Sequence, residues 1–496
     1  MNARNFLAFD LGAESGRAFL GTIENGKLAV REVRRFPNGP VSLAGRLHWD
    51  VPRLLDEMKQ ALKWCAESGA LESIGIDTWG VDFGLIGRKG EMLGLPYSYR
   101  DPGIQTAMER YFDLVPRQTL YDLTGIQFMA FNSLFQLYAL AREGSPLLEA
   151  ASDLLFMPDL FNYLFTGKKT TEATIASTSG FLNPRTGAWE KGLLEAMGVS
   201  SGILREIIQP GTIIGPIEKR LGKEMGLASV PVTATAGHDT AAAVAAVPAE
   251  GSDWAYISSG TWSLVGVEVP GPIITSESRE SNFTNEGSVG GRTRFLKNIA
   301  GLWLLQQCRK IWEKERKWTY DELMAAAEAA PRFVALIDPD SPDFLNPPDM
   351  PEAIASFCLK TGQAPPDTIA AHARCILESL ALKCRHVLEQ LEQIRKRRFQ
   401  TIHIIGGGSQ NTLLCQLTAD ASGLSVVAGP VEATSAGNIL VQAIAAGCVR
   451  DLEEVRLITR RSFVLNVYES RPSTAWDEAY RRFKPLIERP FVLSIS

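Results

Sequence analysis

Apolar positions near the start of the chain predict three strands over residues 5–36. Residues 6–9, Phe-Leu-Ala-Phe, form a short continuous apolar run of the kind found in strands that are buried on both faces. The dipeptide Asn25-Gly26 favours a tight hairpin, because a type I′ turn needs positive φ at both central positions. The strand that follows this turn returns from Lys27 to Phe36.

The apolar spacing then changes from that of a strand to that of a helix. A helix is expected over residues 51–68, with Asp50 as its N-cap and Pro52 in its first turn. The apolar side chains at helical spacing, which we expect to be buried, are Leu54, Leu55, Met58, Leu62 and Cys65. A further strand is expected over residues 73–77.

The second half of the chain repeats this order of strand, hairpin, strand and helix. The expected elements are strands over 254–258, 263–267 and 401–405 and helices over 367–394 and 411–422. A chain of 496 residues is too long for one core. We therefore expect two similar α/β domains, residues 1–247 and 248–496, with a ligand cleft between them.

Composition restricts the class of protein. Apolar residues make up 45% and charged residues 22% of the chain, which is ordinary for a soluble globular protein. The net charge of -5 argues against a nucleic-acid partner. No apolar run reaches transmembrane length, and the N-terminus lacks the form of a signal peptide. The seven cysteines are scattered without zinc-like spacing, so a cytoplasmic protein with reduced thiols is expected, as a monomer or small homo-oligomer.

The segment from Asp10 to Arg17 is a candidate phosphate loop. A strand ends at Asp10 and the chain is expected to turn through Gly12 and Gly16, where backbone amides can point at phosphate oxygens. Asp10 is a candidate to hold Mg²⁺ through water, since this ion prefers a few carboxylates plus waters. Arg17 is a possible phosphate partner. An ordinary glycine-rich hairpin fits the same pattern equally well.

Asp239 is the candidate catalytic base. It follows Gly237 and His238 and precedes an alanine-rich stretch that predicts a helix start. The helix dipole stabilises a carboxylate there, so we expect it to be ionised at pH 7 and able to accept a proton from a substrate hydroxyl. In phosphoryl transfer such a base mainly orients the alcohol. The triplet alone is more typical of an N-cap aspartate with no catalytic role.

Three further glycine segments are candidate ligand contacts. Gly80 follows the strand that ends at Asp77, and it allows a polyol to approach the backbone where strands end. Gly260-Thr261 is expected to close a tight hairpin, from which Thr261 can donate its hydroxyl to a phosphate. A plain β-turn is the alternative there. The glycines at 406–408 suit an adenosine lying against bare backbone, and they match neither the Walker A nor the GxGxxG pattern.

Asn298 and Gln306 are candidate amide contacts. They are eight residues apart, so on a helix they share roughly one face. Buried amides usually bond a ligand or the backbone, whereas surface amides need no partner.

In this order, these segments resemble the FGGY family of carbohydrate kinases, which belongs to the actin-like, sugar-kinase and Hsp70 ATPase superfamily. The resemblance covers about residues 4–445. The motifs that carry it lie at residues 13–17, 76–82, 157–164, 236–240, 258–263, 282–287 and 406–411. Two segments depart from the family pattern, Asp101-Pro102-Gly103 and Ser177–Gly180, and both bear on sugar preference rather than on the chemistry.

The resemblance implies an α/β fold of two actin-like (ribonuclease-H-like) domains, with mixed sheets flanked by helices. It also implies the phosphorylation of L-rhamnulose at O1 with ATP and Mg²⁺, which gives L-rhamnulose 1-phosphate and ADP in the breakdown of L-rhamnose. The alternatives are another ketose or polyol, such as L-fuculose, D-xylulose or glycerol, or a non-catalytic nucleotide-binding protein of the same fold.

The resemblance further implies roles for single residues. Asp239 is the expected proton acceptor, and Asp10 is expected to face the metal. The expected sugar contacts are Gly80, His238, Asp239, Thr240 and Asn298. The expected nucleotide contacts are Ala13, Glu14, Ser15, Gly16, Arg17, Thr261, Gln306 and Gly407.

Overall fold

The chain forms two compact units, each assembled from three segments. The computed structural model describes residues 3–104, 106–227, 229–314, 316–345, 347–471 and 473–488. Unit 1 takes residues 1–248, 268–296 and 432–463, and unit 2 takes residues 249–267, 297–431 and 464–496.

Unit 1 is built on a mixed sheet of order β13-β14-β6-β1-β2-β3. Its strands are β1 (Arg4–Leu11), β2 (Ser15–Glu24), β3 (Lys27–Pro37), β6 (Ser73–Thr78), β13 (Thr212–Pro216) and β14 (Pro231–Ala234). Strand β1 pairs antiparallel with β2 and parallel with β6. The expected hairpin between β2 and β3 is confirmed, with φ of 51° at Asn25 and 69° at Gly26.

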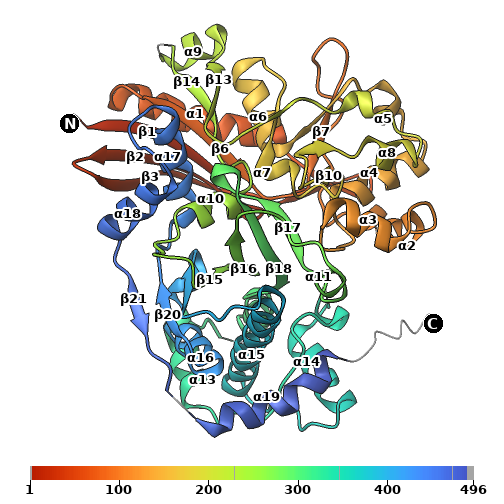
Figure 1. Ribbon diagram of the computed structural model, residues 1–496, viewed down its shortest axis with the longest axis vertical. Helices are drawn as coiled ribbons and strands as arrows, with labels where there is room; N and C mark the ends of the chain where they lie inside the picture. Colours follow the sequence, from red (N-terminus) through yellow and green to blue (C-terminus); the bar gives the residue numbers. More distant parts are fainter. Residues whose placement is uncertain are drawn as a thin grey trace. The chain divides into compact units, whose positions relative to one another are not determined.

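Both faces of this sheet are covered, which explains the continuous apolar run in β1. Leu7 and Phe9 lie in a core shared with α1 (Val51–Ser68), α6 (Met157–Thr166) and α9 (Lys219–Met225). The alternate residues Phe6 and Ala8 lie in a second core with α17 (Ala433–Ala445) and α18 (Leu452–Ser462). Figure 1 shows α17, in blue from late in the chain, against the red strand β1.

Helix α1 begins as its sequence predicts, because the Asp50 side chain accepts a hydrogen bond from the N–H of Arg53. The remaining elements of unit 1 include α10 (Asp239–Ala245) and β17 (Thr284–Gly287), which carry site residues. The others are β4 (Pro40–Leu43), β5 (Arg46–Trp49), β7 (Phe83–Ile86), α2 (Ala107–Tyr111), α3 (Arg117–Thr124), α4 (Ser133–Arg142), α5 (Pro146–Ala150), β8 (Asp153–Phe156), β9 (Thr171–Glu172), α7 (Ala173–Ala176), β10 (Leu182–Asn183), β11 (Ala188–Trp189), α8 (Lys191–Glu195), β12 (Ile207–Ile208) and α11 (Ser276–Glu280).

A second mixed sheet has the order β17-β18-β16-β15-β19-β20-β21. Its strands in unit 2 are β15 (Trp254–Ser259), β19 (Thr401–Ile405), β20 (Ser425–Ala428) and β21 (Asn466–Tyr468). Strands β16 (Trp262–Val269) and β18 (Thr293–Ala300) each continue from one unit into the other.

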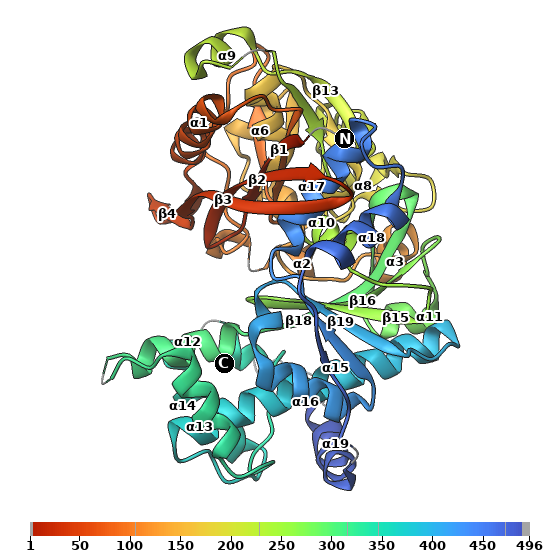
Figure 2. The same cartoon turned by 90° about the vertical axis from the view of Figure 1, so that its left-hand side faces the viewer.

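The long helix α15 (Ile369–Arg395) carries much of the core of unit 2. It lies beside α16 (Thr412–Ser422), as Figure 2 shows. The other helices of unit 2 are α12 (Trp303–Trp312), α13 (Tyr320–Ala329), α14 (Met350–Lys360) and α19 (Thr474–Ile487). The mixed α/β fold expected from the sequence is therefore confirmed, and the two long helices of this half lie within two residues of their expected bounds.

The expectation that Asn298 and Gln306 share one helix is wrong. Asn298 lies in β18 and Gln306 in α12, and Gly301 separates these two elements. A Cβ added to Gly301 would lie 2.6 Å from the carbonyl oxygen of Gly260, so only glycine allows the chain to cross there. This close crossing between chain segments cannot be read from apolar periodicity.

Within the part of the chain that the structure describes, no helix is both long and apolar enough to span a membrane. The cysteines that it describes are all free thiols.

Candidate active site

Helix α10 begins at Asp239, and His238 occupies its N-cap position. The interpretation of Asp239 as a plain N-cap aspartate is therefore wrong. The turn before α10 is held from two sides. The N–H of Thr78, at the end of β6, donates to the carbonyl of Gly237 at 2.9 Å, and the N–H of Gly237 donates to Glu172 Oε2 at 2.9 Å. These bonds fix the position of the first turn of α10 and therefore of the Asp239 carboxylate.

The imidazole of His238 lies between two carboxylates. Its Nε2 is 3.4 Å from Asp239 Oδ1, and its Nδ1 is 3.4 Å from Glu286 Oε2. Arg294 Nη2 also lies 3.0 Å from Nδ1. Gly80 lies near the Nε2 end of the ring, away from Arg294, since a Cβ added there would be 3.3 Å from Nε2. Gly80, His238 and Asp239, predicted separately from the sequence, are thus neighbours in unit 1.

Asp10, Asp77 and Asp239 form an acidic cluster. Burial raises the pKa of Asp10, and the negative charge of Asp239 raises it further while Arg17 opposes it. Burial holds the pKa of Asp77 well above its usual range, and the charges of Asp10 and Asp239 add to this. Among the described residues, Asp77 Oδ1 has no hydrogen-bond partner. Carboxylates that repel one another in this way fit the neighbourhood of a cation.

Arg17 supplies positive charge beside this cluster. Its guanidinium donates to Asp10 Oδ2 and to Glu432 Oε2, each at 2.5 Å, and its side chain is 21% exposed. Asn438 donates to Asp77 Oδ2 at 2.6 Å. Within the described ranges, no group of three or more His, Cys, Asp or Glu side chains is arranged to hold a metal ion directly.

The turn of the candidate phosphate loop is shorter than its sequence predicts. Strand β1 ends at Leu11 and β2 starts at Ser15, so Gly16 and Arg17 lie in the strand and not in the turn. Gly16 is needed for packing, because a Cβ there would lie 2.1 Å from the ring of Phe36.

Two bonds brace this turn from β3. Asn38 donates through its side chain to the carbonyl of Gly12 at 2.7 Å and through its backbone to that of Glu14 at 3.0 Å. The turn is thus held at both ends, directly after Asp10.

The chain beyond Gly80 is held in a sparsely populated conformation. Val81 has φ of 68°, its N–H donates to Thr178 Oγ1 at 3.1 Å, and its carbonyl accepts from Ser133 Oγ at 2.5 Å. The Ser177–Gly180 segment, which departs from the family pattern, therefore borders Gly80. The second departure, Asp101, accepts instead from Arg46 and from the N–H of Leu47, which gives it a structural role.

Asp82 is a buried acid to which no role was assigned from the motifs. Its Oδ2 accepts from the indole N–H groups of Trp49 at 2.6 Å and Trp79 at 3.0 Å, and its Oδ1 accepts from Gln136 at 2.8 Å. Burial raises the pKa of this carboxyl to about 6, although these bonds oppose the rise. Trp79 is 5% exposed and belongs to the core. Asp82 follows Trp79 by three residues in an otherwise apolar stretch, and a lone acid in such a stretch is a sequence signal for a buried carboxyl group.

In unit 2 the predicted residues gather around one hairpin, Ser259-Gly260-Thr261. The N–H groups of Leu302 and Trp303 donate to the carbonyls of Gly260 and Thr261, at 3.0 and 3.2 Å, so the start of α12 with Gln306 is tied to this hairpin. The short 3-10 helix Gly407–Gln410 approaches it closely, because a Cβ on Gly408 would lie 2.0 Å from Ser259 Oγ. At Gly407 the same Cβ would meet nothing within 4 Å.

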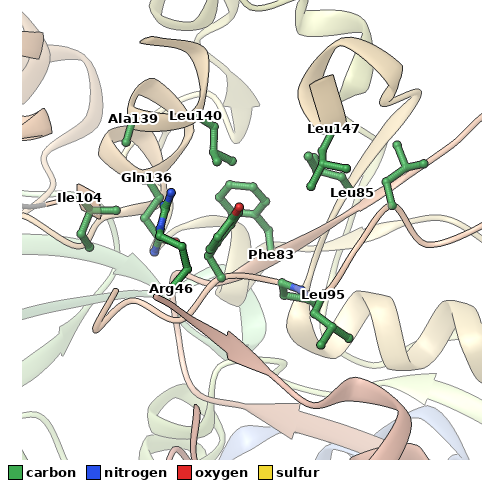
Figure 3. A pocket seen from close by; sticks show the side chains of 12 residues that line it. Arg46, Phe83, Leu85, Leu95, Ile104, Gln136, Ala139, Leu140 and Leu147 are labelled. Carbon is green, nitrogen blue, oxygen red and sulfur yellow. The ribbon is translucent and has the colours of Figure 1, made fainter. Parts of the chain in front are cut away.

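A small cavity of about 20 Å³ also lies in unit 1. Figure 3 shows Phe83, Leu85, Leu140 and Leu147 around it, with Arg46 and Gln136 as polar neighbours. This volume suffices for about one water and is too small for a sugar. Neither His238 nor Asp239 lines it, so it is not part of the candidate site.

The structure thus divides the predicted residues into two sets. Unit 1 holds Asp10, Ala13, Glu14, Ser15, Gly16, Arg17, Gly80, His238, Asp239 and Thr240, and unit 2 holds Thr261, Asn298, Gln306 and Gly407. Sequence reasoning gave no role to Glu286 and Arg294, the ion pair beside His238.

Comparisons with known proteins show the family of this chain. Residues 5–246 match the N-terminal domain of the FGGY family of carbohydrate kinases, and residues 255–446 match the C-terminal domain of that family. A rhamnulokinase of Bacteroides thetaiotaomicron is 47% identical over 482 residues, which are 97% of this chain and 99% of that protein. A rhamnulokinase of Enterococcus faecalis is 40% identical over 473 residues, or 95% of each chain.

The fold has counterparts among solved structures. The crystal structure of gluconate kinase from Lactobacillus acidophilus superposes with a TM-score of 0.80 at 18% identity, and covers 98% of this chain and 97% of that one. At this identity the likeness concerns the fold alone.

Proposed function

The chain belongs to the FGGY family of carbohydrate kinases, and we propose that it transfers the γ-phosphoryl group of ATP to the 1-hydroxyl of L-rhamnulose. The products are L-rhamnulose 1-phosphate and ADP. The observation that carries the proposal is the near full-length identity of 47% to a protein named rhamnulokinase. The site of unit 1 supports the reaction type. The carboxylate of Asp239 lies at the start of α10, beside the imidazole of His238 and near Asp10, which precedes the candidate phosphate loop.

Asp239 is the proposed proton acceptor. Its Oδ1 already accepts from the N–H of Thr240 at 2.5 Å, which orients the carboxylate and leaves Oδ2 for the sugar hydroxyl. Because phosphoryl transfer depends chiefly on positioning and charge, the base serves to align the attacking oxygen and to take its proton as the new bond forms. Gly80, His238, Thr240 and Asn298 are proposed to contact the sugar.

The phosphates are proposed to bind at the turn after Asp10, through Ala13, Glu14, Ser15, Gly16 and Arg17. Thr261, Gln306 and Gly407 of unit 2 are proposed to bind the remainder of the nucleotide. Arg17 now bridges Asp10 and Glu432, so contact with a phosphate oxygen requires it to exchange one of these partners.

Asp10 would hold Mg²⁺ through water, which fits the acidic cluster that Asp10 forms with Asp77 and Asp239. When bound, the ion supplies positive charge to the phosphate oxygens. The carboxylates of Asp10 and Asp77 would then hold the positive ion close to Asp239.

The test is an ADP-release assay with ATP, Mg²⁺ and a panel of sugars that contains L-rhamnulose, L-fuculose, D-xylulose and glycerol. We expect kcat/KM to be highest for L-rhamnulose by at least about 10-fold, the range that one or two differential contacts supply. Preference for another sugar would show that the substrate assignment is wrong, although the family assignment would stand. Absence of sugar-dependent ADP release from folded protein would overturn the reaction.

A further inference from the structure

The buried ion pair of Glu286 and Arg294 faces the ring of His238. The two residues lie directly opposite each other on the antiparallel strands β17 and β18. Arg294 Nη2 is 3.1 Å from Glu286 Oε2, and the Arg294 side chain is fully buried. A buried pair of this kind is costly to assemble, which makes its position beside a sugar-binding histidine informative.

Arg294 is held rigidly. Its Nε donates to the carbonyl of Gly287 at 2.9 Å, in addition to the contact with Glu286. Gly287 is in turn fixed by its own N–H, which donates to Ser177 Oγ at 2.8 Å. Burial disfavours the charged form of Glu286, yet Arg294 together with His238 and Thr284 outweighs this, and the pKa of Glu286 lies below its usual value. The pair is therefore a fixed, charge-balanced support.

The geometry decides which nitrogen of His238 carries the proton. A guanidinium has only donors, so the 3.0 Å contact from Arg294 Nη2 requires His238 Nδ1 to be an acceptor. A proton on Nδ1 directed at Glu286 would oppose the Arg294 N–H, and that contact is longer, at 3.4 Å. In this geometry Nδ1 acts as an acceptor, which leaves Nε2 to carry the ring proton.

The protonated Nε2 is the atom that faces the proposed reaction centre. It lies 3.4 Å from Asp239 Oδ1 and next to Gly80. Asp239 offers only acceptors when ionised, whereas Nε2–H is a donor. The two side chains therefore present opposite hydrogen-bonding requirements to a bound sugar.

We propose that Arg294 and Glu286 are positioning residues that lock His238 in its Nε2–H tautomer, so that it donates a hydrogen bond to a sugar oxygen beside the hydroxyl that Asp239 accepts from. This deepens the proposed function and rests on it for the identity of the sugar. The lock itself concerns the free protein and can be measured without any substrate.

The direct test is the protonation state of His238 in protein labelled with ¹⁵N-histidine. The chain has five histidines, and the spectrum of a His238→Gln variant assigns the resonance that is lost. We expect Nε2–H and a bare Nδ1 at pH 7.5 in the free protein. An Nδ1–H tautomer or an imidazolium would overturn the proposal.

The lock is broken with the double variant Arg294→Met/Glu286→Gln, which removes both buried charges together and avoids leaving one unpaired. We expect the His238 resonances to move towards a mixture of tautomers. The matched control is Arg292→Gln, which removes an arginine two residues away that pairs with Glu268 at 2.7 Å. The control should leave the His238 resonances unchanged, and an unchanged double variant would also overturn the lock.

Kinetics separate a positioning role from a merely structural one. We expect the double variant to raise KM for L-rhamnulose about 10-fold, the effect of one hydrogen bond, with KM for ATP within about twofold. In a His238→Gln background, where the amide nitrogen supplies a donor without any tautomer, the same double change should add less than about twofold. Additive effects in both backgrounds would contradict the lock.

The two proposals fail in different ways. If no sugar is turned over by the wild-type protein, the proposed function fails while the ¹⁵N spectra still decide the tautomer. If L-rhamnulose is the substrate and the tautomer is wrong, only the lock fails. Unfolding midpoints of all variants show whether each is folded.

Discussion

The two sets of site residues are built in different ways. In unit 1, charged side chains lie near Asp239 and are held by hydrogen bonds and ion pairs, as when Arg17 donates to Asp10 and Glu432. In unit 2, Gly301 crosses the backbone of the Gly260 hairpin and Gly408 packs against Ser259, and neither glycine leaves room for a Cβ. The first region therefore depends on charge and protonation, and the second on volume.

This difference predicts how each region responds to substitution. Changes that keep shape and alter charge should act mainly in unit 1. Changes that add a single methyl group should act mainly in unit 2. The four predictions below test this contrast, beginning with the largest expected effect.

Asp239→Asn keeps the shape of the side chain and removes the proton acceptor. We expect kcat to fall by about 100-fold or more, or roughly 3 kcal/mol of transition-state stabilisation, with an unchanged unfolding midpoint. Steady-state ADP release measures this, and Asp56→Asn on the exposed face of α1 is the control. Turnover within a few fold of wild type would show that Asp239 is not the base.

The stability of unit 1 should depend on pH through Asp82. Its pKa is raised from 3.8 to about 6, so the folded chain binds a proton that the unfolded chain releases between about pH 4 and 6. The contribution of Asp82 to the free energy of unfolding is therefore complete near pH 4 and is lost as the pH rises through about 6. Relative to Asp82→Asn, the wild type should lose about 3 kcal/mol between pH 4 and 7, measured by urea unfolding. A pH-independent difference between the two proteins would contradict the shift.

Neighbouring glycines of the 406–408 turn should respond oppositely to a methyl group. Gly408→Ala drives its Cβ into Ser259 and should destabilise the protein by about 2 kcal/mol, because the backbone there must move. Gly407→Ala meets nothing within 4 Å and should leave stability within about 1 kcal/mol while raising KM for ATP. Unfolding midpoints and ATP titrations distinguish the two outcomes. Equal KM values for ATP in Gly407→Ala and wild type would show that Gly407 does not contact the nucleotide.

The smallest effect is expected at Thr261. Thr261→Val removes one hydroxyl at constant volume and should lower kcat/KM for ATP about 5- to 10-fold, the value of one hydrogen bond of about 1 kcal/mol. Thr261→Ser keeps the hydroxyl and should stay within about threefold of wild type. If both variants behave alike, the hydroxyl makes no contact with a phosphate.

Local signals predicted the local parts of this structure. The Asn25-Gly26 turn, the Asp50 cap and the apolar run of β1 each depend on neighbours within a few residues, and all are confirmed. The pairing of Glu286 with Arg294 depends on strand register, which the residue types alone do not fix. The break at Gly301 depends on a crossing segment about forty residues away, so Asn298 was assigned to the wrong element.

The candidate site followed the same rule. Motif order located Asp239, His238 and Gly80 and implied that they act together, and unit 1 places them side by side. The supporting acids, Asp82 and Glu286, were missed because their roles come from burial and from partners distant in sequence.

The separation in sequence between the ends of unit 1 has a consequence for synthesis on the ribosome. Arg17 and Asp77 emerge early, but their partners Glu432 and Asn438 are translated only after most of unit 2. During that interval the face of the sheet that α17 covers lacks this helix, so the first segment of unit 1 cannot complete its packing until the last segment is made. A nascent chain that ends before α17 should therefore be a client of chaperones rather than a folded domain.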